Sequence, residues 1–101
     1  MTTRIAICGA AGRMGRALIH AIANRDDVKL TAAIERPESS LIGADAGEMA
    51  ALSRMGVKIS DSLASQIDLV DVVIDFTAPA ATIANVALCR QEGKGIVIGT
   101  T

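Results

Sequence analysis

The residues best able to do chemistry in this chain are three glycines near its start. Gly9, Gly12 and Gly15 follow each other at intervals of three residues in the run Gly-Ala-Ala-Gly-Arg-Met-Gly. Glycine allows a turn with φ > 0 and, having no Cβ, lets an anion approach the backbone closely. A helix beginning at this run would direct its first N–H groups and the positive end of its dipole at that anion. The run therefore predicts a turn that binds phosphate groups.

The candidate phosphate-binding residues of this turn are Gly9, Ala10, Ala11, Gly12, Arg13 and Met14. The turn departs from the G-x-G-x-x-G fingerprint of dinucleotide-binding folds, because Ala10 stands where the first glycine would fall. It has no Gly-Lys-Ser/Thr and is therefore not a P-loop. Arg13 opposes the dipole at the start of a predicted helix, and a phosphate beside it would account for a cation there. Gly15 we interpret as a close-packing residue.

Two adjacent charged residues, Glu35 and Arg36, follow a strongly apolar run. Glu35 lies 20 residues after Gly15, close to where dinucleotide-binding folds carry an acidic residue. A carboxylate there accepts hydrogen bonds from the adenosine ribose and favours NAD, whereas the Arg36 guanidinium can pair with the 2′-phosphate of NADP. The sequence therefore leaves NADH and NADPH both open as cofactors.

Asp75, Phe76 and Thr77 form a further candidate segment. Asp75 ends an otherwise apolar run, and a carboxylate there needs a hydrogen-bond partner. Phe76 is the only aromatic residue and could lie against a nicotinamide or a ribose. Capping of the following helix and contact with a cofactor explain this segment equally well, so both interpretations stay open.

Short apolar, β-branched runs predict five buried strands. They cover Ile5–Cys8, Val28–Ile34, Val57–Ile59, Val72–Phe76 and Ile96–Ile98. Two longer segments show helical periodicity. The first has the apolar stripe Met14, Ala17, Leu18, Ala21 and Ile22, and the second has Ala80, Ile83, Ala84, Ala87 and Leu88. Pro79 begins the second helix and Gly93 ends it.

The remaining segments predict shorter elements. Residues 48–55 and 61–67 read as short helical segments, and residues 37–47, with Pro, Ser and Gly, as a mobile loop. His20 falls on the polar face of the first helix, where we expect it to have no role.

Strands that alternate with helices predict an α/β fold with a doubly wound, Rossmann-like parallel sheet in the order 3-2-1-4-5. The 101 residues would form one domain. Because parallel strands end at the same edge of the sheet, four segments should converge there. These are Gly9–Gly15, Glu35 with Arg36, Asp75–Pro79, and Gly99, Thr100 and Thr101.

Composition argues against several classes of protein. The net charge is −1 and no run of like charges exceeds two, so no nucleic-acid or membrane-surface partner is expected. No apolar stretch approaches the ~20 residues that cross a bilayer. Cys8 and Cys89 lack metal-site or C-x-x-C spacing and predict buried, reduced thiols in a cytoplasmic protein. The chain shows no catalytic triad, acid pair or metal-ligand cluster, so we predict no catalytic residue and no metal site.

Four segments taken together resemble one known family. They are Gly9–Gly15, Glu35-Arg36 with Ser39–Glu48, Asp75–Thr77 and Val97–Thr101. From Ile5 to its last residue the chain is similar to the bacterial dihydrodipicolinate reductases, also named 4-hydroxy-tetrahydrodipicolinate reductases, of diaminopimelate and lysine biosynthesis. The resemblance implies an oxidoreductase that transfers hydride from NADH or NADPH to a cyclic, imine-like dicarboxylate, usually as a homotetramer.

The resemblance also implies a role for each matching residue. The turn from Gly9 to Met14 would bind the pyrophosphate, and Glu35 the adenosine ribose. Arg36 with Arg13 would bind the 2′-phosphate of NADPH. Gly99, Thr100 and Thr101 would lie on the nicotinamide side.

The family is much longer than this chain, and its substrate domain would follow residue 101. We therefore expect an N-terminal fragment that binds NAD(P)H weakly, turns nothing over and self-associates through the unpaired edge of its last strand. Two other interpretations remain open. One is a non-catalytic nucleotide-sensing module of the same fold, and the other is the cofactor domain of another amino-acid-pathway dehydrogenase.

Overall fold

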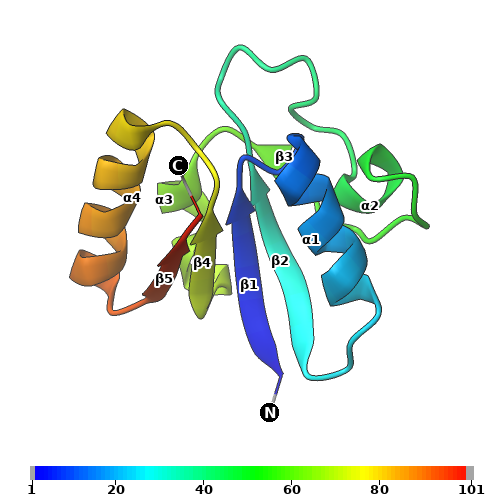
Figure 1. Cartoon of the computed structure of the whole chain (residues 1–101), viewed down its shortest axis with the longest axis horizontal. Helices are drawn as coiled ribbons and strands as arrows, with labels where there is room; N and C mark the ends of the chain where they lie inside the picture. Colours follow the sequence, from blue (N-terminus) through cyan, green and yellow to red (C-terminus); the bar gives the residue numbers. More distant parts are fainter. Residues whose placement is uncertain (1, 100–101) are drawn as a thin grey trace.

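The computed structural model describes residues 2–99, which form one parallel sheet covered by helices on both faces (Figure 1). The strands are β1 (Thr3–Cys8), β2 (Val28–Ile34), β3 (Ile59–Ser60), β4 (Val72–Asp75) and β5 (Gly95–Ile98). Their order is β3-β2-β1-β4-β5, and every neighbouring pair is parallel. The predicted Rossmann-like sheet is therefore confirmed. The candidates Thr100 and Thr101 lie outside the described residues.

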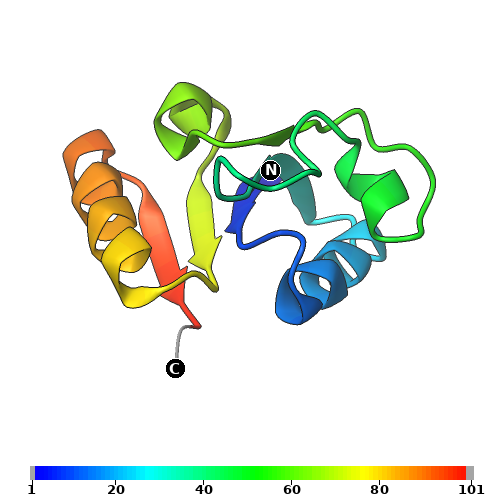
Figure 2. The same ribbon diagram turned by 90° about the horizontal axis from the view of Figure 1, so that it is seen from above.

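Helices pack on the two faces of the sheet in separate pairs, which Figure 2 shows from above. On one face lie α1 (Arg13–Ala23) and the short α2 (Ala46–Met49). On the other lie α3 (Leu63–Gln66), continued by the 3-10 turn η1 (Ile67–Leu69), and α4 (Pro79–Glu92). The prediction of one or two helical turns over 61–67 is confirmed.

The strand side chains alternate between two apolar cores. Ile5 and Ile7 of β1 contribute to the core under α1 and α2, whereas Ala6 and Cys8 contribute to the core under α3 and α4. This alternation follows from the period of two along a strand. Complete burial of one isoleucine side chain contributes about 1.5–3 kcal/mol. A strand buried on both faces has no polar side, which explains the unbroken apolar run in β1.

The two outer strands differ from the sequence prediction. β3 begins two residues later and ends one residue later than the predicted strand Val57–Ile59, because the Val57 N–H binds the Asp45 carboxylate while Ile59 and Ser60 pair with β2. β5 was expected to be buried, and this is wrong. Val97 is 57% exposed and Ile98 50%, because β4 is the only strand that pairs with β5 among the described residues and α4 covers one of its faces.

A helix over residues 48–55 was also a wrong prediction. The helix α2 occupies residues 46–49 and begins inside the segment expected to be a loop. Ala51 takes φ = +63°, which turns the chain back after one helical turn. The reversal lets the N–H groups of Met55, Gly56 and Val57 reach the carboxylate of Asp45.

The apolar stripes predicted for the two long helices are correct only in part, since Leu18 and Ile22 of α1 and Leu88 of α4 pack against the cores but the other stripe residues do not. α1 buries Gly15, Ile19 and Ile22, while Met14, Ala17 and Ala21 are exposed. α4 turns Thr82 and Cys89 inward and leaves Ala80, Ala84, Ala87 and Ile83 exposed, the last at 72%. The inward face of α4 is selected by a polar bond, because its Asn85 donates to the buried carboxylate of Asp75. Within residues 2–99, no helix has the length and apolar character needed to cross a membrane.

Candidate functional site

A cavity of about 450 Å³ lies where β1, β4 and β5 end. Its walls come from the glycine turn and the start of α1, from the segment between β4 and α4, and from the residue after β5. The lining residues are Gly9, Gly12, Arg13, Met14, Gly15, Phe76, Thr77, Ala78, Pro79 and Gly99. The predicted convergence is therefore observed for the glycine turn, for the segment after β4 and for Gly99, but not for Glu35 and Arg36. Figure 1 shows both α1 and α4 starting at this edge of the sheet.

Most amides of the glycine turn are already used within the fold. The N–H groups of Gly9 and Ala10 both donate to the carbonyl of Ile34, and that of Gly12 donates to Gly9. The N–H of Ala11 donates to the Glu35 carboxylate at 2.8 Å. These bonds fasten the turn to the end of β2.

The amides that remain available belong to the first turn of α1. Its first helical hydrogen bond runs from the N–H of Arg16 to the carbonyl of Gly12, so the N–H groups of Arg13 and Met14 have no helical acceptor. Met14 is 48% exposed and lines the cavity instead of entering the core. The turn therefore shapes the site, and Arg13 and Met14 supply its donors. Ala10, also a candidate, is fully buried and contributes shape alone.

Two glycines are required here by close approach. Gly9 has φ = +84°, and a Cβ on it would lie 2.9 Å from the carbonyl oxygen of Phe76. A Cβ on Gly15 would lie 2.5 Å from the carbonyl oxygen of Ala10 and closer still to that of Gly9. The close-packing role predicted for Gly15 is confirmed. Gly12 differs, since a Cβ there would meet only the Gly9 carbonyl, at 3.4 Å.

The helices of the described chain begin in two different ways. Asp45 caps α2 by accepting from the N–H of Glu48, and Ser62 caps α3 by accepting from the N–H of Ser65. α1 begins after Gly12 and α4 after Ala78, and neither has a side-chain cap. Both uncapped helices open onto the 450 Å³ cavity. Their N-terminal dipole ends therefore favour an anion in that cavity.

Glu35 and Arg36 lie beside the turn and do not line the cavity. One carboxylate oxygen of Glu35 accepts from Ala11, and the other accepts from the N–H of Arg36 at 3.4 Å. The Arg36 side chain is exposed, with its Nε 3.7 Å from a carboxylate oxygen of Glu38. An exposed pair at that separation leaves the guanidinium free to exchange partners.

Asp75 is completely buried and its hydrogen bonds are internal. It accepts from the N–H and hydroxyl of Thr77 and from the side-chain amide of Asn85. Of the two interpretations of this segment, the geometry favours a structural role for Asp75, which holds the loop that enters α4. Burial, reinforced by the Asp75 charge, raises the pKa of Cys8 to about 12, so this thiol stays protonated at neutral pH.

Phe76 and Thr77 face the cavity from the loop that Asp75 holds. The Phe76 ring lies directly against Gly99, where a Cβ would be 2.7 Å from the ring carbon Cδ1 and closer to two others. The N–H of Gly99 donates to the carbonyl of Asp75. The aromatic ring thus forms part of the wall where β4 and β5 end.

Asp45 is a central residue that the sequence analysis did not single out. Its carboxylate accepts from the backbone N–H groups of Glu48, Met55, Gly56 and Val57. These bonds, that of Met55 first, lower the pKa of Asp45 to about 2. Asp45-x-x-Glu48 is a helix-start pattern that could have revealed the cap but not the other three donors.

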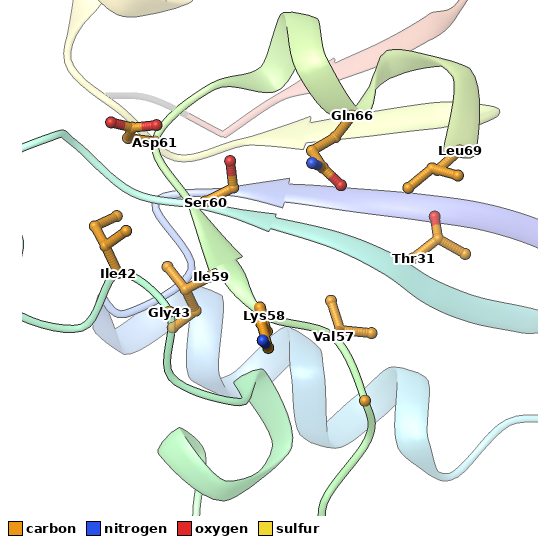
Figure 3. Close-up of a pocket in the computed structure, with 11 residues that line it drawn as sticks. Thr31, Ile42, Gly43, Val57, Lys58, Ile59, Ser60, Asp61, Gln66 and Leu69 are labelled. Atoms are coloured by element: carbon orange, nitrogen blue, oxygen red, sulfur yellow. The ribbon is translucent and has the colours of Figure 1, made fainter.

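A second cavity, of about 490 Å³, lies along β3 (Figure 3). Thr31, Ile42, Lys58, Ser60 and Gln66 are among the residues around it, and none was a candidate from the sequence. No long helix begins at its walls. The first cavity is therefore the better candidate site, because it gathers the predicted residues and both uncapped helices.

Comparison with known families identifies the fold and its relatives. A family model described as "Dihydrodipicolinate reductase, N-terminus" matches residues 3–101. The chain belongs to the dihydrodipicolinate reductase family. The resemblance inferred from the glycine turn and the three other segments is confirmed.

Named relatives agree with this family. The chain is 54% identical over 101 residues to a 4-hydroxy-tetrahydrodipicolinate reductase of Saccharophagus degradans, covering 100% of this chain and 38% of the relative. It is 58% identical over 99 residues to that of Pseudomonas fluorescens, covering 97% of this chain and 37% of the relative. The chain thus spans little more than a third of the length of these relatives.

A solved structure of the family has the same fold. The dipicolinate-bound dihydrodipicolinate reductase from Paenisporosarcina sp. TG-14 superposes with a TM-score of 0.79 at 27% identity. The alignment covers 100% of this chain and 38% of that one. The parallel sheet and its flanking helices are therefore those of a dihydrodipicolinate reductase N-terminal region.

Proposed function

We propose that this chain forms the NAD(P)H-binding part of a 4-hydroxy-tetrahydrodipicolinate reductase of lysine and diaminopimelate biosynthesis. The observation that carries the proposal is the pair of uncapped helix starts, α1 and α4, at one cavity beside a glycine turn. An anion bound there would accept hydrogen bonds from the N–H groups of Arg13 and Met14. The positive ends of both helix dipoles would also stabilise its charge. The pyrophosphate of a dinucleotide has the matching charge.

The rest of a dinucleotide also finds suitable partners. Glu35, the residue after β2, would accept from the adenosine ribose, and this role is supported by one of its oxygens, which accepts only from the N–H of Arg36 at 3.4 Å. Gly12, which is exposed and lacks a Cβ, would let the pyrophosphate approach the backbone closely. When bound, the nicotinamide supplies hydride, and we propose that Phe76, Thr77 and the segment Gly99, Thr100 and Thr101 orient it.

We propose that both NADH and NADPH bind. One Glu35 oxygen is committed to Ala11, which leaves a single oxygen for the ribose hydroxyls of NADH. Arg36, exposed and weakly paired with Glu38, can turn to a 2′-phosphate together with Arg13. The two features oppose each other, so neither cofactor is strongly excluded.

A titration tests the cofactor site. We expect NADPH and NADH to bind the chain, and Arg36→Ala to weaken NADPH about tenfold while leaving NADH within a factor of two. Lys29→Ala, an exposed cation in β2 that lies away from the cavity, is the matched control. If neither NADPH nor NADH binds at millimolar concentration, the proposed function is refuted. An unchanged NADPH to NADH ratio in Arg36→Ala would refute the 2′-phosphate role alone.

The remaining steps we assign to the reductase as a whole. We propose that reduction of the dicarboxylate requires segments of the relatives that this chain does not match, so that residues 1–101 alone bind cofactor without turnover. A homotetrameric assembly is proposed for the whole enzyme. Cys8 and Cys89, both buried and free, support a cytoplasmic location.

A further inference from the structure

The backbone of Ala11 is bonded to charged side chains at both its N–H and its carbonyl oxygen, which belong to two consecutive peptide groups. Its N–H donates to the Glu35 carboxylate at 2.8 Å. Its carbonyl oxygen accepts from Nε of Arg16 at 2.9 Å. Among the turn residues described above, Ala11 is the one whose N–H and carbonyl oxygen are both bonded to side chains, because Gly9, Ala10 and Gly12 donate to backbone carbonyls.

The Arg16 guanidinium also reaches a third segment. Its NH1 nitrogen lies 3.4 Å from the carbonyl oxygen of Met49, at the end of α2. One helical turn later, the ring nitrogen Nε2 of His20 lies 2.6 Å from the carbonyl oxygen of Ala50. His20 was expected to have no role, so this contact corrects the sequence analysis. Arg16 and His20 thus join α1 to α2 side by side, but only Arg16 also touches the glycine turn.

We propose that Arg16 is a positioning residue for dinucleotide binding, which holds the Ala11 carbonyl while Glu35 holds the Ala11 N–H, and so aims the N–H groups of Arg13 and Met14 at the pyrophosphate. This inference rests on the proposed function. In this role Arg16 acts through its bonds to the carbonyl oxygens of Ala11 and Met49 and does not have to touch the cofactor.

The physical reason is the absence of an internal cap at this helix. Gly12 has no side chain to fix the first turn of α1, and nearby Gly9 adds backbone freedom. A side-chain cap would orient the turn but would also consume its donors. Arg16 and Glu35 orient the turn through Ala11 instead, which leaves the amides of Arg13 and Met14 available. Groups prepositioned in this way bind an anion without an ordering cost.

The test combines ligand binding with exchange of the Ala11 amide. In Arg16→Gln we expect the dissociation constant for NADPH to rise about five- to tenfold, because the turn loses its hydrogen bond from the charged guanidinium. Affinity for adenosine 2′-monophosphate, which has no pyrophosphate, should change less than twofold at 0.15 M salt, where distant charges are screened. Hydrogen exchange at Ala11 in the free protein should accelerate about tenfold.

Two further variants separate positioning from charge and from stability. Arg16→Lys keeps the charge but cannot span both carbonyls, and we expect NADPH affinity between those of wild type and Arg16→Gln. His20→Gln loosens the same α1–α2 contact without touching Ala11, and we expect its NADPH affinity and Ala11 exchange to match wild type.

The outcomes distinguish this inference from the proposed function. If the wild-type chain binds no dinucleotide, the proposed function fails and the positioning role fails with it. If wild type binds and Arg16→Gln binds NADPH equally well, only the positioning role fails. The inference would also be overturned if Arg16→Gln weakened the binding of NADPH and of adenosine 2′-monophosphate equally while Arg16→Lys bound both like wild type. Arg16 would then act only through its positive charge.

Discussion

The capped helices α2 and α3 and the uncapped helices α1 and α4 begin in different ways and at different places in the described chain. The carboxylate of Asp45 and the hydroxyl of Ser62 accept from the first turns of α2 and α3. Gly12 and Ala78 stand at the corresponding positions of α1 and α4 and accept nothing through a side chain. The uncapped pair opens onto the cavity and the capped pair does not.

This difference shows how a fold divides stability and binding among similar elements. A cap stabilises a helix start by about 1 kcal/mol and leaves fewer donors for any ligand. A helix without a cap keeps its first N–H groups available for a ligand but lacks this stabilisation. The long helices, which have 11 and 14 residues, carry the exposed starts, while helices of one turn are capped. Packing against the sheet compensates the long helices for the missing caps.

The largest expected effect comes from filling the contact between α1 and its turn. Gly15→Ala would place a methyl group 2.5 Å from the carbonyl oxygen of Ala10. Backbone cannot yield as a flexible side chain does, so we expect a loss of about 3 kcal/mol in unfolding free energy, measured by urea denaturation. Gly12→Ala is the control, since a Cβ there has room. Equal stability of the two variants would contradict the packing role of Gly15.

The second effect comes from removing the multiple cap of Asp45. Asp45→Asn turns one of the two acceptor oxygens into a donor, which then faces the N–H groups of either Glu48 and Met55 or Gly56 and Val57, and we expect a clear fall in thermal midpoint. Asp26→Asn, on the exposed turn before β2, should leave the midpoint unchanged.

The contribution of Asp45 to stability should also be visible in the acid unfolding of the wild-type protein. Because the pKa of Asp45 falls from 3.8 to about 2 on folding, its stabilising contribution is complete above pH 3.8 and is lost as the pH falls through about 2. We expect Asp45→Asn to show a shallower decline of unfolding free energy over this range. Some slope should remain, because Arg4 and Arg25 hold the pKa values of Asp71 and Asp27 low as well. Identical slopes would show that the Asp45 bonds do not form.

A third change would turn an uncapped helix into a capped one. Gly12→Ser adds a hydroxyl that can accept from the first turn of α1, so stability should rise by about 0.5 kcal/mol. The same hydroxyl competes with the pyrophosphate for those donors, and NADPH affinity should fall about tenfold. Gly12→Ala separates the hydroxyl from the added carbon, and calorimetric titration of both variants measures the difference. Unchanged affinity in Gly12→Ser would mean that these donors do not bind the ligand.

The smallest effect on cofactor affinity is expected at a capped helix away from the cavity. Ser62→Ala removes the bond to the N–H of Ser65 and should cost about 1 kcal/mol of unfolding free energy. NADPH affinity should stay at the wild-type value, because α3 contributes no residue to the cavity. A parallel loss of affinity would show that caps and binding donors are not separated as the comparison suggests.

Much of the site could be predicted because its requirements are local. The spacing of Gly9, Gly12 and Gly15 and the position of Glu35 follow from what a phosphate-binding turn needs within a few residues of chain. The parallel strand order followed from alternating strands and helices and from the fixed hand of their connections. The structure confirms the sheet and brings Arg13, Met14, Phe76, Thr77 and Gly99 to one cavity. Their contacts with a cofactor remain a prediction.

Other features depend on contacts between distant residues, which local patterns do not contain. The inward face of α4 was predicted incorrectly because alanines lie on several of its faces, and the bond from Asn85 to Asp75 selects the buried one. Exposure of Val97 depends on what packs beside β5, which its apolar sequence does not reveal. The sequence by itself determined the strand order and the residues of the turn. Tertiary structure alone decided how Arg16, Glu35 and Asp45 hold the surrounding backbone, because those bonds join segments that meet only after folding.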